Sequence, residues 1–158
     1  MREKNTSRVV VALTGVVAVT ALALSIWALT RTPSDDPTSY SSAQQSAART
    51  AVCQSFDLAL RGVSLQTNAT APAGQAGGLA TEANARLALA VGSMTLTEAV
   101  DENPAAPKAV QDAARKLAKQ YRLVSAAYLA GFGIDQGPVP QALRDAGAAA
   151  TALTAACR

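Results

Sequence analysis

Residues 108–128 read K-A-V-Q-D-A-A-R-K-L-A-K-Q-Y-R-L-V-S-A-A-Y and carry the clearest structural signal in the chain. Apolar side chains recur there in steps of four and three, which is the spacing of one buried face of an α-helix. They are Val110, Ala114, Leu117, Tyr121, Val124 and Tyr128. Charged side chains occupy the other side, as is typical of a helix in a bundle. The pattern predicts a helix over about residues 106–130.

Three further segments carry helical patterns. The segment 42–67 follows a capping serine at Ser41 or Ser42, and its expected buried residues are Ala48, Val52, Phe56, Ala59, Leu60 and Val63. The expected buried residues of 79–101 are Leu79, Ala83, Leu87, Ala90, Val91, Met94 and, at its end, Val100. Those of 139–157 are Val139, Leu143, Ala146, Ala150, Leu153 and Cys157. Alternation of period two, the strand signal, appears nowhere.

Stretches rich in glycine and proline separate these segments at 68–78, 103–107 and 131–138. Because the connections are short, we expect an all-α, antiparallel four-helix bundle. Narrow seams rich in alanine and poor in aromatic residues predict closely packed helices with little room for a large internal cavity.

An uncharged apolar run from Val9 to Thr30 precedes the bundle. As a helix its about 22 residues would span about 33 Å, enough to cross a bilayer core. A cleaved signal peptide would have a shorter apolar core followed by small residues, whereas this run ends in S-I-W-A-L-T (25–30). We therefore expect a retained signal-anchor, a single-pass transmembrane helix over 9–30.

Charges on the two sides of this run predict its orientation. Arg2, Lys4 and Arg8 precede it, and Asp35 and Asp36 follow it. The positive-inside rule then places the N-terminus in the cytoplasm. The expected organisation is a cytoplasmic tail over 1–8, the transmembrane helix, a flexible linker over 31–41 and an extracytoplasmic four-helix domain over 42–158.

Cys53 and Cys157 are the two cysteines of the chain, and both fall on the expected outer side. An even count in an oxidising compartment favours a disulfide. In an up-down-up-down bundle both residues belong to the same end, although Cys53 lies some turns into its helix. Two free thiols or an intermolecular bridge are the alternatives.

Composition argues against most enzyme classes. The chain has no histidine, which removes the usual general base and most zinc, copper and haem ligands. Glu98, Asp101 and Glu102 could form a paired-acid or calcium site, but a solvated helix end is the favoured interpretation. From Arg31 onward the chain has 11 basic and 10 acidic residues. Because this part is nearly neutral, we expect no nucleic-acid partner. No cofactor, metal or catalytic residue is expected.

Two features could contact a partner. Arg115, Lys119 and Arg122 form a basic stripe on 106–130, whose alternative interpretation is an ordinary solvated face. Phe132 and Ile134 are the large apolar residues of a glycine loop, where they could grip a partner or fold back to plug the end of the bundle.

Several segments resemble the uncharacterised alanine-rich (alanine and proline rich) single-pass membrane proteins of mycobacteria and related actinobacteria. They are V-C-Q-S-F-D-L-A-L-R-G-V-S-L-Q-T-N (52–68), E-A-N-A-R-L-A-L-A-V-G-S-M (82–94), E-N-P-A (102–105) and D-A-A-R-K-L-A-K-Q-Y-R (112–122), with a cysteine near the C-terminus. Those relatives often carry a proline-rich cytoplasmic tail, whereas eight residues precede the apolar run here. The resemblance implies a location in the cell envelope and brings no activity with it.

The expected function is that of a membrane-anchored interaction or assembly module of the cell envelope, without catalysis. The alternative is a tethered domain that binds a lipid or a small molecule between its helices. Tyr121, Tyr128 and Met94, all expected on inner faces, motivate that alternative.

Overall fold

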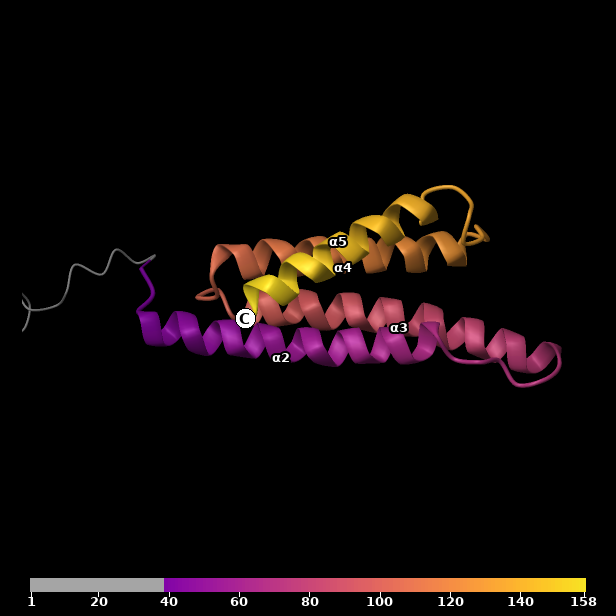
Figure 1. Cartoon of the computed structure of the whole chain (residues 1–158), viewed down its shortest axis with the longest axis horizontal. Coiled ribbons are helices and arrows are strands. Elements are labelled where there is room, and N and C mark those ends of the chain that lie inside the picture. The colour runs from indigo at the N-terminus through magenta and orange to yellow at the C-terminus, as the bar shows by residue number, and fades with distance from the viewer. Residues whose placement is uncertain (1–38) are drawn as a thin grey trace, which may run out of the picture. The chain divides into compact units, whose positions relative to one another are not determined.

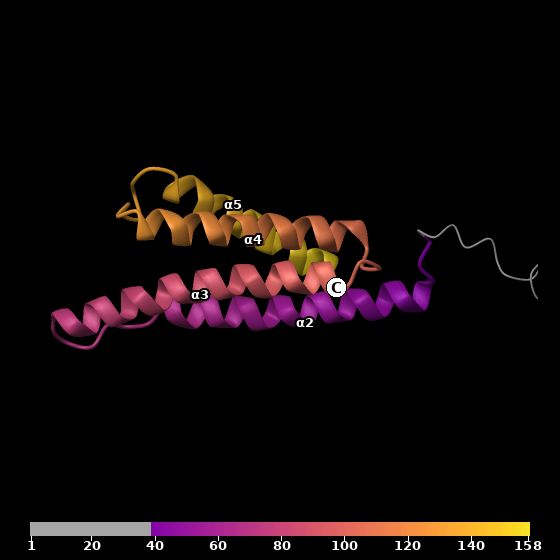
Figure 2. The ribbon, with the colours of Figure 1, turned by 180° about the vertical axis from the view of Figure 1, so that it is seen from behind.

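The computed structural model describes residues 39–158, in which four helices pack against one another (Figure 1). They are α2 (Ser42–Thr67), α3 (Gln75–Glu102), α4 (Lys108–Leu129) and α5 (Val139–Ala156). Successive helices run in opposite directions in the views from both sides (Figure 1 and Figure 2). The expected all-α, four-helix arrangement is confirmed.

Residues Tyr40–Arg158 form a unit of their own, with a hydrophobic core to which all four helices contribute. The expected cytoplasmic tail over 1–8, the transmembrane helix over 9–30 and residues 31–38 of the linker lie outside the described residues. Among residues 39–158, no helix combines the length and the apolar character that a membrane crossing requires.

Helix α2 has the bounds predicted from the sequence. It begins with a capping box, because Ser41 Oγ accepts a hydrogen bond from the Gln44 amide and the Gln44 side chain accepts one from the Ser41 amide. The expected buried face is confirmed with one exception. Leu60 is 36% exposed, since it lies to one side of the face that contacts the other helices.

Helix α3 corrects the sequence analysis. It begins four residues earlier than predicted, and most of the residues expected inside lie in solvent. Leu79, Leu87, Val91 and Met94 are 50–61% exposed. The buried residues are Leu89, Gly92, Ser93, Leu96, Ala99 and Val100.

Two small residues of the inner α3 face, Gly92 and Ser93, lie where α2 and α4 approach this helix closely. A Cβ atom at Gly92 would lie 3.1 Å from Val63 Cγ2 on α2 and 3.5 Å from Tyr121 Cδ2 on α4. Next to it, the Ser93 hydroxyl donates a 2.8 Å hydrogen bond to the backbone oxygen of Ala118. A side chain at position 92 would therefore crowd Val63, whereas Leu89, Leu96 and Val100 fill the rest of the inner face.

Helix α4 agrees with the sequence pattern, whereas α5 agrees only in part, because Ala142 and Ala149 are buried unexpectedly and Ala150 and Cys157 are only half-buried. Five of the six residues of the α4 seam are buried, and the sixth, Tyr128, is half-buried. Helix α5 buries Val139, Ala142, Ala146, Ala149 and Leu153, whereas Leu143 of the expected face is 37% exposed.

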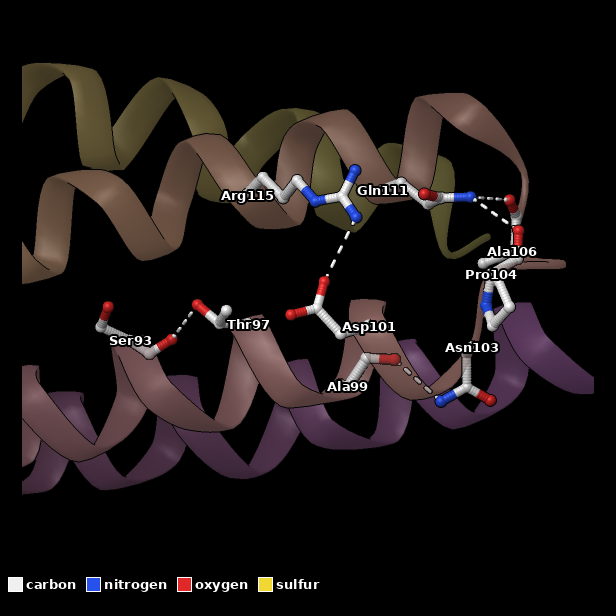
Figure 3. Close-up of polar contacts among 9 residues, drawn as sticks. All are labelled: Ser93, Thr97, Ala99, Asp101, Asn103, Pro104, Ala106, Gln111 and Arg115. Atoms are coloured by element: carbon white, nitrogen blue, oxygen red, sulfur yellow. Dashed lines mark hydrogen bonds and ion pairs between the residues drawn. The ribbon is translucent and has the colours of Figure 1, made fainter.

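The turn between α3 and α4 is held by side chains at both helix ends (Figure 3). Asn103 donates a 2.8 Å hydrogen bond from Nδ2 to the Ala99 carbonyl at the end of α3. From the start of α4, Gln111 Nε2 donates to the carbonyl oxygens of Ala106 at 2.7 Å and Pro104 at 3.1 Å. These bonds satisfy backbone groups that a helix end leaves open.

A disulfide joins Cys53 of α2 to Cys157, directly after α5, with a Cα–Cα distance of 5.8 Å. The predicted pairing is confirmed, and the two alternatives are excluded. Helix α5 packs mainly along α4 and crosses it obliquely, so its C-terminal end lies near α2 and its N-terminal end lies farther away (Figure 1 and Figure 2). The disulfide therefore closes one end of the bundle between α2 and α5.

Candidate functional site

The end of the bundle opposite the disulfide carries a half-open groove of about 590 Å³, which we call the distal groove. All four helices and the loop between α4 and α5 contribute to it. Its lining residues are Val63, Thr67, Glu82, Ala85, Arg86, Leu89, Tyr121, Val124, Tyr128, Gly131, Phe132, Gly133, Ile134 and Leu143. The volume is within the range of sites for small organic ligands. The groove is open on one side, so it is not the large internal cavity that the alanine-rich seams argue against.

The direction of α5 explains the opening. A fourth helix lying parallel to the others would cover the groove between α2 and α4. Here α5 is tied to α2 only at its C-terminal end, by the disulfide, and diverges toward its N-terminal end (Figure 1). Leu143 is therefore the single α5 residue that reaches the lining.

The end of α4 positions the loop at the mouth of the groove. Gly131 has a φ of 87°, which a side chain would disfavour, and its amide donates to the Tyr128 carbonyl at 3.1 Å. The Phe132 amide donates to the Ala127 carbonyl at 3.1 Å. These two bonds form a Schellman motif, which ends the helix and directs Phe132 back toward it.

Phe132 and Ile134 both line the distal groove, and of the two interpretations of this loop the plug does not fit, while contact with a partner stays a prediction. Phe132 is 43% exposed and Ile134 is 60% exposed. A plug at the end of a bundle would be buried. The two residues instead form an apolar rim that is open to solvent.

Two tyrosines of α4 supply polar groups to the groove. Tyr121 is only 6% exposed, and burial raises the pKa of its phenol. Burial also raises the pKa of Tyr128, an effect that the nearby Arg86 opposes and Asp135 reinforces. Neither hydroxyl bonds another residue within 39–158, where no side-chain polar atom sealed from solvent lacks a partner. Both phenols are thus neutral donors that open to the groove.

Charge at the rim is balanced. Arg86 Nη2 forms a 3.0 Å ion pair with Glu82 Oε2 one turn earlier on α3. The Arg86 backbone oxygen also accepts a 3.1 Å hydrogen bond from Ser125 Oγ of α4. The sequence analysis missed both rim charges, because it placed their side of α3 in solvent. The four-residue spacing of Glu82 and Arg86, close to the apolar Leu89, was the feature of the sequence that could have indicated this pair.

A second candidate surface is the outer side of α3, which we call the outer α3 stripe: Leu79, Ala83, Leu87, Val91 and Met94. Successive members are three or four residues apart, so they share one side of the helix. All are exposed. Met94, expected inside with the two tyrosines, belongs to this outer surface instead.

The basic residues of α4 do not form one site. Arg115 Nη2 reaches Asp101 Oδ1 at 3.3 Å across the α3–α4 interface (Figure 3). Arg122 lines a smaller cleft of about 410 Å³ between the same helices, together with Glu98 and Met94. Lys119 is exposed and borders neither cavity. The expected stripe is thus divided among three environments.

The acidic residues near the end of α3 are not gathered into a site either. Glu98, Asp101 and Glu102 are all exposed, and Asp101 pairs with a base rather than with another acid. Over residues 39–158, no three His, Cys, Asp or Glu side chains are close enough together to hold a metal ion.

Comparisons of the chain with protein-family models, with curated proteins and with solved structures give no match.

Proposed function

We propose that this chain is a membrane-tethered interaction module of the cell envelope, which binds a helix of a partner protein along the outer α3 stripe and performs no catalysis. The exposure of four large apolar side chains on one side of α3 carries this proposal. Single exposed leucines are ordinary, but a continuous apolar stripe on a packed helix marks an interaction surface.

The stripe suggests the chemistry of the partner. Leu87, Val91 and Met94 follow the i, i+4, i+7 spacing by which one helix packs on another. Glu98 and Glu102 continue the same side, and neither is part of an ion pair within residues 39–158. A matching partner helix has an apolar stripe that ends in lysine or arginine.

A second copy of the chain fits this surface less well. Two copies anchored in one membrane would present α3 in the same direction. Glu98 and Glu102 would then face their own counterparts, and such like-charge contacts are costly. The proposal therefore commits to a different protein.

The proposed location is the outer side of the cell membrane, with the N-terminus in the cytoplasm. The uncharged run Val9–Thr30 and its flanking charges support this orientation. The Cys53–Cys157 disulfide supports an oxidising compartment. The resemblance to actinobacterial membrane proteins points to the same envelope.

Photocrosslinking in the producing cells tests the proposal. A benzophenone amino acid replaces Val91 in the full chain, and in a control it replaces Lys116, which is exposed on α4. We expect a covalent adduct with one other protein from position 91 and none from position 116. Glu98→Lys should reduce that adduct several-fold, whereas Asp57→Lys, an exposed site on α2, should leave it unchanged.

Three outcomes count against the proposal. Equal adducts from both positions would show an unspecific surface. No adduct from position 91, with the protein at its normal level, would remove the partner. An adduct formed only with a second copy of the chain would show that the stripe mediates self-association and does not bind a different protein.

A further inference from the structure

We infer that the distal groove is a second binding site, which takes one neutral amphiphile with an apolar body and a hydrogen-bond acceptor of the ester-carbonyl type. The site shares no residue with the outer α3 stripe. Binding at the distal groove can therefore be tested separately from the proposed partner interaction.

The walls select an apolar body. Val63, Leu89 and Val124 are buried residues that form the inner surface, and Phe132 and Ile134 form the rim. A volume of about 590 Å³ accommodates one small molecule or one acyl chain rather than a complete two-chain lipid. Because the groove is half open, part of the ligand remains in contact with solvent.

The tyrosines select an acceptor. The Tyr121 side chain is more than nine-tenths buried, yet its hydroxyl has no hydrogen-bond partner within residues 39–158. Tyr128, which is half-buried, supplies a second hydroxyl without a hydrogen-bond partner among these residues, two helical turns further along α4. Because no polar side-chain atom sealed from solvent within residues 39–158 lacks a partner, both hydroxyls are open to solvent, and a phenol in its neutral form can donate there to a carbonyl or ether oxygen. A ligand oxygen could accept a hydrogen bond from either hydroxyl.

The charges around the groove select against an ionic ligand. Arg86 is the one cation in the lining, and Glu82 pairs with it at 3.0 Å. Asp135 lies close enough to Tyr128 to affect its titration. A carboxylate or phosphate ligand would have to compete with Glu82 for Arg86, and a cationic ligand would meet Arg86. A neutral head group avoids both penalties.

An acyl ester has this chemistry, and it can arrive from the bilayer or from solution. A full chain in phosphatidylcholine nanodiscs tests both sources. One arm adds 1-decanoylglycerol that carries a diazirine in its acyl chain. The other arm places the same diazirine in the acyl chain of the phosphatidylcholine. Mass spectrometry of the labelled peptides then shows where each probe binds.

Two alanines of α3 provide matched variants. Ala85 lines the groove, so Ala85→Phe should fill it and lower labelling of the groove peptides by about tenfold. Ala80 is exposed on the same helix outside the groove, and Ala80→Phe should leave labelling unchanged. Tyr121→Phe and Tyr128→Phe should each weaken competition by unlabelled decanoylglycerol by about 2- to 10-fold, the effect of one hydrogen bond.

Charged competitors test the selectivity. Decanoate and decyltrimethylammonium have chains of similar length, and each should require about tenfold higher concentration than decanoylglycerol to displace the probe. Labelling in the soluble arm alone identifies a free amphiphile, and labelling in the bilayer arm identifies a membrane lipid. The inference is overturned if Ala85→Phe and Ala80→Phe label equally, or if a charged competitor displaces the probe as well as the neutral one does.

Discussion

Gly92 of α3 lies against the ring of Tyr121 on α4, so that a Cβ atom at position 92 would stand 3.5 Å from Tyr121 Cδ2. The same atom would stand 3.1 Å from Val63 Cγ2 on α2, which is tighter than ordinary van der Waals contact. Gly92 therefore lies where α2, α3 and α4 meet, next to a tyrosine that also lines the distal groove.

Replacing Gly92 by a large residue should destabilise the bundle. We expect Gly92→Leu to lower the free energy of unfolding by about 1–3 kcal/mol through overpacking, although leucine favours helix. Gly62→Ala on α2 is the control, since a Cβ there meets nothing within 4 Å. It should raise the free energy of unfolding by about 0.5–1 kcal/mol. Thermal unfolding by circular dichroism in mild detergent measures both, and a stable Gly92→Leu variant would contradict the close approach.

The contrast between α4 and α3 shows what the sequence could reveal about the fold. On α4, charged and apolar residues occupy separate sides, so periodicity alone identified the buried face. On α3, large apolar residues lie on both sides of the helix, Leu87 and Met94 on one and Leu89 and Leu96 on the other, so periodicity alone did not identify the buried face. The choice depended on how closely Val63 and Tyr121 approach Gly92, which is a property of the neighbouring helices.

The candidate site was predictable in part. The sequence placed Tyr121 and Tyr128 on an inner face and drew attention to Phe132 and Ile134, and all four line the distal groove. The groove itself exists because α5 diverges from α2, and no local pattern reports the angle between two helices. Arg86 was missed because the sequence suggested the wrong buried face for α3.

Removing the disulfide should weaken the bundle and loosen α5 in particular. Cys53 and Cys157 are 104 residues apart, and a crosslink over so long a loop is worth about 2–5 kcal/mol. We expect the double variant Cys53→Ser, Cys157→Ser to have a free energy of unfolding lower by that amount and therefore to unfold at a lower temperature. Amide hydrogen exchange should increase most in α5, whose C-terminal end the bond ties to α2. Dithiothreitol should lower the stability of the native chain and leave the double variant unaffected; an equal response of both chains would refute the assignment.

Two leucines of α3 provide a direct test of its corrected orientation. Leu89 is 3% exposed and Leu87 is 61% exposed, although they are only two positions apart. Leu89→Ala should lower the free energy of unfolding by about 2–4 kcal/mol, because it removes buried methyl groups and leaves a cavity. Leu87→Ala should change it by no more than about 0.5 kcal/mol. Urea unfolding of the two variants gives the comparison, and the reverse order would restore the face expected from the sequence.

The buried phenol of Tyr121 should make stability depend on alkaline pH. Burial raises its pKa above the ordinary value of 10.0, so the unfolded chain releases this proton at a lower pH than the folded chain does. Between the two pKa values the folded state binds more protons, and the free energy of unfolding therefore falls as the pH rises above about 10. Tyr121→Phe removes the group and should reduce this fall. Unfolding measured for both chains at several values between about pH 9 and 11 isolates the contribution, since every other titrating group is shared. Parallel curves for the two chains would show that the Tyr121 hydroxyl is solvated in the folded state, and would remove it as a buried donor in the distal groove.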